Sequence, residues 1–292
     1  MNTDTSIDKW YNQKSFIQNT SVQVLKEHNS NILVGIFKLS DQYDLTSFKK
    51  DDSLFNNFGV QSILIDDKNI IHFNEKYDIL SNQEIIQSQI PLVEYINSNI
   101  IDCIKEKKIN RIFITIDDLS LTPTRRIILN AIMAMISHNP SIYVFGMSGA
   151  IQSILNDITS HIEPSILDDQ NHQFKEIKII PHSHLANIVN KFLIPDINGW
   201  FTMQVLDARL GSVNNTPSNR ERLDLLGFTV AAFARDGSIE AIEDQYGNIY
   251  LQNHLIFFMK NIERTFSLES YKGFQSSILC SIAIMYNFLY HT

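Results

Sequence analysis

Short apolar runs alternate with amphipathic stretches along the first half of the chain. The runs 31–37, 60–65, 111–116 and 142–145 are rich in β-branched and aromatic residues, which favour strands. Between them, apolar residues recur at three- and four-residue steps, as they do in helices. Strand, helix and strand in this order form a βαβ unit. The pattern therefore predicts an α/β fold with a mostly parallel, flavodoxin-like central sheet flanked by helices on both faces.

Three longer segments carry a helical pattern. Residues 81–107 form an amphipathic region that we expect to break at Pro91, and residues 124–139 form a second helix. A third helix, 271–290, is expected to cover the core, and a homodimer contact is the alternative. Its predicted apolar face consists of Phe274, Ile278, Ile282, Met285 and Leu289.

The second half begins with a strand and turn at 172–188 and then contains a hairpin and a final strand. Residues 228–243 predict the hairpin, because Asp236-Gly237 between two apolar runs supplies the positive φ that such turns need. Residues 248–256 predict the last strand. We expect a single domain over 31–292, preceded by an N-terminal extension, residues 1–30.

The segment 142–155 holds the candidate chemistry. Its strand ends at Gly146 and a helical pattern starts two residues later, so Ser148 is predicted to lie in a tight strand-to-helix turn. Such a turn is a nucleophile elbow, which holds a small nucleophile beside a helix N-terminus. The alternative is an ordinary buried strand followed by a helix that Ser148 caps.

The sequence around this turn, Gly146-Met-Ser-Gly-Ala-Ile-Gln152, resembles a block of the class I glutamine amidotransferase-like family. It is most similar to the Gly-Ile-Cys-Arg-Gly-Met-Gln block of the γ-glutamyl-γ-aminobutyrate hydrolase branch, peptidase family C26. Further similar blocks follow in the family's order over roughly residues 31–260. The resemblance implies the family's fold, with Ser148 at the position of the nucleophilic cysteine and His254 at that of the histidine. Gly149 and Gln152 then belong to the candidate oxyanion and pocket residues.

Three departures from the family weaken hydrolysis. Asp117 and Asp118 stand where the family has a Gly-Gly loop that helps to form the oxyanion hole, and carboxylates there would destabilise an oxyanion. Ile256 replaces the glutamate that orients the histidine. The segment 213–219 retains Asn214 of a substrate-side loop, but Ser218 and its neighbours replace two histidines.

These departures lead to a first hypothesis and two alternatives. The first is a degenerate, pseudoenzyme-like member of the family that binds or regulates, with a γ-glutamyl or amide compound or a protein as its partner. The second is a hydrolase of a γ-glutamyl, amide or peptide bond that depends on Ser148 and His254. The third is the transfer of glutamine-derived ammonia to a separate synthase. None of them requires a cofactor.

The composition limits the classes of partner that we expect and indicates the cellular compartment. The chain is 44% hydrophobic and 19% charged, as a soluble globular protein is, and its net charge of -8 argues against nucleic acid as a partner. Cys103 and Cys280 lie in apolar helical contexts and form no disulfide or metal framework. Since no secretory signal or membrane span is recognisable, we expect a cytoplasmic protein, with export by a route that needs no cleaved signal left open.

Two further groups of polar residues have a structural and a functional interpretation. His182 and His184 could bind a metal only with Asp168, Asp169 or His172, so we expect a surface turn and no metal. Arg125 and Arg126 could bind an acidic substrate, and solvated surface charge is the expected alternative.

Overall fold

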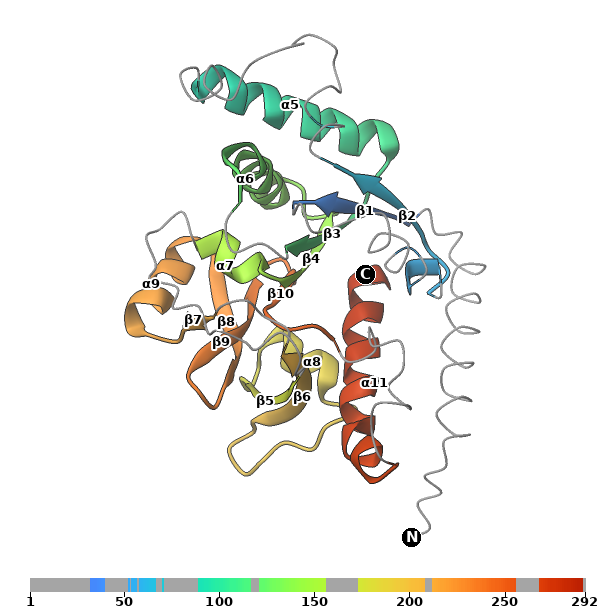
Figure 1. Ribbon diagram of the computed structural model, residues 1–292, viewed down its shortest axis with the longest axis vertical. Helices are drawn as coiled ribbons and strands as arrows, with labels where there is room; N and C mark the ends of the chain where they lie inside the picture. The colour runs from blue at the N-terminus through green and yellow to red at the C-terminus, as the bar shows by residue number, and fades with distance from the viewer. Residues whose placement is uncertain are drawn as a thin grey trace.

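The structure is a computed structural model that describes residues 32–39, 52, 54–56, 58–66, 70, 89–116, 121–155, 173–207, 212–255 and 268–290. Within these residues the strands form one ten-stranded sheet with the order β2-β1-β3-β4-β10-β9-β8-β5-β6, and β7 pairs with β9 (Figure 1). The strands of the first half are β1 (Leu33–Lys38), β2 (Gln61–Ile65), β3 (Arg111–Ile116) and β4 (Tyr143–Ser148). Those of the second half are β5 (Gln173–Ile179), β6 (Phe201–Asp207), β7 (Val213–Asn214), β8 (Phe228–Ala234), β9 (Ser238–Asp244) and β10 (Ile249–Leu251).

The sheet changes from parallel to antiparallel at β10. Strands β2, β1, β3, β4 and β10 are all parallel, whereas β10, β9, β8, β5 and β6 pair antiparallel. The α/β fold is thus confirmed, but the sheet is mixed, so the mostly parallel, flavodoxin-like description is not. The predicted hairpin is present as β8 and β9, with Gly237 at φ 83° in its turn.

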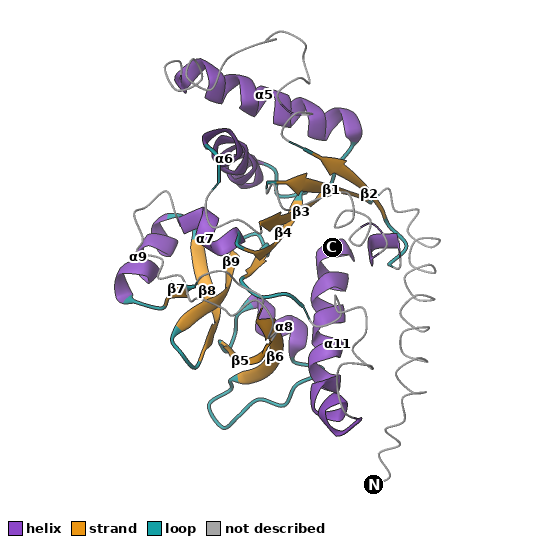
Figure 2. Cartoon of the chain, viewed as in Figure 1, coloured by secondary structure: helices purple, strands orange, loops and turns teal. Residues whose placement is uncertain are grey.

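Helices cover both faces of the sheet (Figures 1 and 2). The core on one face includes residues of α5 (Gln89–Lys107), α6 (Pro123–His138), α7 (Ala150–Leu155) and α9 (Pro217–Leu225). The core on the other includes residues of α8 (His184–Val189) and α11 (Leu268–Tyr290). In Figure 1, α5 and α6 lie on one side of the parallel strands and α11 lies on the other.

Local signals explain where several of these helices begin. Pro91 lies in the first turn of α5, where a missing N–H costs nothing, and residues 81–88 of the predicted helical region are not described. Thr122 caps α6 through the N–H of Arg125. Thr216 and Pro217 begin α9 in the same way, and we did not predict this helix.

The last turn of α11 is held by Arg111 of β3. The Arg111 side chain is buried, and its Nε donates to the carbonyl oxygens of Phe288 at 2.8 Å and Leu289 at 3.0 Å. Its guanidinium carbon also lies 4.7 Å from the centre of the Tyr143 ring. Burial lowers the pKa of Arg111, and a cation at the carboxyl end of a helix stabilises that end. The C-terminal helix covers the core, as predicted, because Ile284, Met285 and Leu289 belong to the buried cluster on that face of the sheet.

Replacing Arg111 by methionine should lower the free energy of unfolding by about 2 kcal/mol, because two buried carbonyls lose a charged donor. Hydrogen exchange in residues 280–290 should also accelerate. Arg220→Met is the matched control: the side chain of this exposed arginine donates its Nε–H to Asn215 at 2.6 Å, and its loss should cost less than about 0.5 kcal/mol. Equal losses for the two variants would contradict the anchoring role of Arg111.

The two cysteines are both buried and free. Burial raises the pKa of Cys280 to about 12, so its thiol is a poor nucleophile. Neither thiol lies at the elbow, since Cys103 is on α5 and Cys280 is on α11. Among the helices that the structure describes, none has the length and apolar character needed to cross a membrane.

Candidate functional site

Ser148 lies at the carboxyl end of β4 with a left-handed backbone. Its φ is 59°, a conformation that non-glycine residues adopt at a cost of about 1–2 kcal/mol. The strand passes directly into α7 at Ala150, so the turn is as tight as the sequence predicts. Gly146 makes this close passage possible, because a Cβ there would lie 3.0 Å from the Cβ of Ala150. The backbone thus has the form of a nucleophile elbow.

His254 follows the neighbouring strand β10. Tyr250 of β10 pairs with Gly146 of β4 in parallel register, so Ser148 at the end of β4 and His254 just after β10 lie at the carboxyl ends of adjacent strands. The N–H and carbonyl of His254 form an isolated bridge with Leu206, each bond 3.3 Å long.

The backbone N–H of Gly149 is already hydrogen-bonded. It donates to the carbonyl oxygen of Ile116 at 2.7 Å, which continues the pairing of β3 with β4 by one residue. In a nucleophile elbow, the N–H that follows the nucleophile is one of the two oxyanion-hole donors. In the described arrangement that donor is engaged with Ile116.

The other predicted pocket residues fall into different environments. Gln152 is buried on α7, 3% exposed, one turn after Ser148. Asn214 is exposed on β7, opposite Ser238 of β9. Ser218 is exposed on α9 rather than in a loop, which corrects the loop expected there. Asp117, Asp118 and Ile256 lie outside the described residues.

A cluster of charged side chains that we did not predict lies at the same edge of the sheet. Lys175 of β5 donates to Asp236 at 2.8 Å, to Ser238 at 2.9 Å and to Glu240 at 2.7 Å. The Glu240 side chain is fully buried and that of Lys175 is 14% exposed. Asn253, which precedes His254, donates its Nδ2 to the other carboxylate oxygen of Glu240. The cluster therefore reaches the segment that carries His254.

Asp236 makes the stability of this cluster depend on pH. Burial raises the pKa of its carboxyl, but hydrogen bonds from Lys175 and Ser238 outweigh burial and lower the pKa well below its usual value. A folded pKa below the unfolded one gives stability that is present above the unfolded pKa of about 3.9 and is lost as the pH falls through the folded pKa.

We therefore expect Asp236→Asn to flatten the acid limb of the stability profile. The wild type should lose unfolding free energy as the pH falls below about 4, and the variant should lose less over the same range. Urea unfolding at pH 5 and pH 3 measures the difference. Parallel pH profiles for the two proteins would show that the Asp236 carboxylate does not contribute.

The structure places His182, His184 and Arg125 in contacts that the sequence left open. His182 has φ 66° in the turn before α8, and the backbone N–H of His184 donates to Glu243 at 2.9 Å. Within the part of the chain that is described, no group of three or more His, Cys, Asp or Glu side chains could hold a metal; Asp168, Asp169 and His172 lie outside it. Arg125 is buried, 6% exposed, so the expectation of solvated charge is wrong for this residue.

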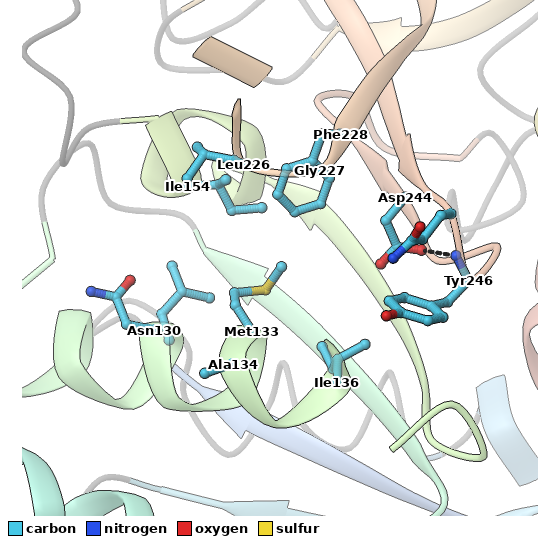
Figure 3. Close-up of a pocket in the computed structure, with 12 residues that line it drawn as sticks. Asn130, Met133, Ala134, Ile136, Ile154, Leu226, Gly227, Phe228, Asp244 and Tyr246 are labelled. Atoms are coloured by element: carbon cyan, nitrogen blue, oxygen red, sulfur yellow. Dashed lines mark hydrogen bonds between the residues drawn. The ribbon is translucent and has the colours of Figure 1, made fainter. Parts of the chain in front are cut away.

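A pocket of about 470 Å³ lies at the other end of the sheet (Figure 3). Figure 3 shows Met133 and Ile136 of α6 across the pocket from Ile154 of α7 and Phe228 of β8. It adjoins the turn before β10, where the N–H of Tyr246 donates to the Asp244 carboxylate at 2.9 Å. It is therefore separate from the edge that carries Ser148 and His254.

Comparisons of the sequence with protein-family models and with curated proteins find no match. The resemblance to class I glutamine amidotransferase-like proteins stays a prediction that rests on the quoted sequence blocks.

Proposed function

We propose that the chain is a divergent class I glutamine amidotransferase-like protein that binds a ligand at the Ser148 edge and no longer hydrolyses it by the Cys-His-Glu route. The ligand we propose is a small γ-glutamyl or amide compound. Ser148 and His254 stay at the carboxyl ends of adjacent parallel strands, where ligands bind in open α/β sheets. In this proposal the scaffold is retained for binding or regulation.

The observation that carries the proposal is the hydrogen bond from Gly149 to Ile116. A hydrolase of this class uses that N–H to stabilise the oxyanion of its tetrahedral intermediate, and loss of one oxyanion donor costs on the order of 10²–10³ in turnover. A bond of 2.7 Å to a backbone carbonyl competes directly with that role. Catalysis would require this bond to break and the N–H to turn toward the substrate.

The nucleophile is also poorly activated. A serine hydroxyl is far less acidic than a thiol, so it depends more on a general base. Ile256 stands where the family has the acid that orients its histidine. Loss of the acid in a Ser-His-Asp site costs on the order of 10⁴ in turnover.

One observation favours hydrolysis as the second candidate function. Ser148 keeps a left-handed φ of 59°, and strained backbone of this kind clusters at active sites. A serine that served only as a helix cap would have an extended backbone instead. The elbow geometry would suit a Ser148/His254 hydrolase of a γ-glutamyl, amide or peptide bond.

The test compares wild type, Ser148→Ala, Ser153→Ala and His254→Ala in two assays. A fluorophosphonate probe reports serine nucleophiles, and titration calorimetry with γ-glutamyl-aminobutyrate and γ-glutamyl-p-nitroanilide reports binding. We expect binding without labelling or turnover, and weakening of about tenfold in His254→Ala, as for the loss of one good hydrogen bond.

Ser153 is the matched control, since it is a buried serine on α7, the helix that follows Ser148. Labelling or turnover that disappears in Ser148→Ala and persists in Ser153→Ala would reject the binding proposal in favour of the hydrolase. Absence of binding to both compounds would reject the ligand class.

A further inference from the structure

Glu240 is a fully buried carboxylate at an irregular point of β9. The ladder between β8 and β9 pairs Ala232 with Ala241 and then Phe233 with Ile239, so its register skips Glu240, as it does at a β-bulge. Bulges redirect a side chain and are over-represented beside active sites. Here the redirected carboxylate points into the cluster with Lys175 and Ser238.

Two groups of Glu240 hold the segment between β10 and His254. Its backbone carbonyl accepts the N–H of Gln252 at 2.9 Å, and its carboxylate accepts the side-chain Nδ2 of Asn253. On the other side, His254 is bridged to Leu206 of β6. Residues 252–254 are therefore held by Glu240 of β9 on one side and by Leu206 of β6 on the other.

The charge of Glu240 also fixes the orientation of the Asn253 amide. An ionised carboxylate only accepts hydrogen bonds, so the NH₂ group of Asn253 must face it and the carbonyl Oδ1 must point away. That oxygen is buried and has no partner among the described residues. Lys175 of β5 and Ser238 both donate to the Glu240 carboxylate and fix its position. The fixed carboxylate in turn sets the orientation of the Asn253 amide, which precedes His254.

We infer that Glu240 is a positioning residue for His254, acting through Asn253 and Gln252. It orders the histidine segment from β9, while the position of the family's acid holds Ile256. The inference rests on the proposed function in taking His254 as a site residue. Its test reads the imidazole itself, so a failure to find any ligand would leave the inference intact.

The test compares two double variants that both remove the buried ion pair. Lys175→Met/Glu240→Gln keeps a carbonyl acceptor for Asn253, whereas Lys175→Met/Glu240→Leu removes it. Replacing a buried pair by apolar residues is often neutral, so both should fold. In protein labelled with ¹³C at histidine, the Cε1–H signal of His254, assigned through His254→Gln, should stay in place in the first variant and shift or split in the second.

Controls separate positioning from general loosening. Glu243→Gln removes a second buried carboxylate of β9, whose oxygens accept from the N–H groups of His184 and Leu185. It should move the His184 signal and leave that of His254 unchanged. If the leucine variant does not fold, Asn253→Ala removes the same contact from the other side. An unchanged His254 signal in a folded Lys175→Met/Glu240→Leu or Asn253→Ala protein would overturn the inference.

Discussion

Replacing Gly146 by alanine is expected to lower the free energy of unfolding by about 3 kcal/mol, near the upper end for overpacking. The new methyl group would lie 2.5 Å from Cδ1 of Tyr250 and 3.0 Å from the Cβ of Ala150. Tyr250 cannot move aside easily, because it is fully buried and its ring packs edge-on against Phe228 at 5.5 Å. Either β4 and β10 separate or α7 shifts, and both changes would disturb the turn at Ser148.

Two other glycines provide the comparison. At Gly35 the nearest atoms are side-chain carbons of Ile109, at 3.0 and 3.1 Å, which can rotate away, so Gly35→Ala should cost about 1 kcal/mol. At Gly237 no atom lies within 4 Å, and its φ of 83° alone should make Gly237→Ala cost about 1 kcal/mol. Urea unfolding of the three variants measures the order. A loss in Gly146→Ala no larger than in Gly35→Ala would show that α7 and Tyr250 yield without strain.

The turn at Ser148 could be predicted because its causes are local. A strand that ends in a small residue, followed within two residues by a helical pattern, leaves the chain little choice but a sharp bend. The hairpin at Asp236-Gly237 was predictable for the same reason. Helix α9 was predictable too, because Thr216-Pro217 is a helix-start signal. We assigned the segment to a loop by resemblance and missed it.

The direction of the strands beyond β10 could not be predicted in this way. The βαβ pattern of the first half was extended to the whole sheet, whereas β5 and β6 reach their places through pairings with residues far away in the sequence. The bond from Gly149 to Ile116 and the pair of Lys175 with Glu240 are non-local as well; the latter residues are 65 positions apart. One signal was available: Glu240 interrupts the apolar run Ile239-Glu-Ala-Ile242, and a carboxylate in such a place needs a partner.

The second large effect is expected at that pair: Lys175→Met should lower the free energy of unfolding by about 3–4 kcal/mol. The methionine covers the apolar surroundings of the lysine stem but leaves the Glu240 carboxylate, which is fully buried, without its cation. Ser238 and Asn253 still donate to it, yet neutral donors do not balance a buried charge. Urea unfolding at pH 7 measures the loss.

Lys178→Met is the matched control on the same strand. Its ammonium lies 3.6 Å from Asp196 and both side chains are well exposed, at 44% and 38%, so its loss should cost less than about 0.5 kcal/mol. Adding Glu240→Leu to Lys175→Met should restore most of the lost stability, because the unpaired charge is then gone. If the single variant is as stable as the Lys178 control, the pair contributes little. If the double variant is no more stable than the single one, the loss of stability arises from packing rather than from the unpaired Glu240 carboxylate.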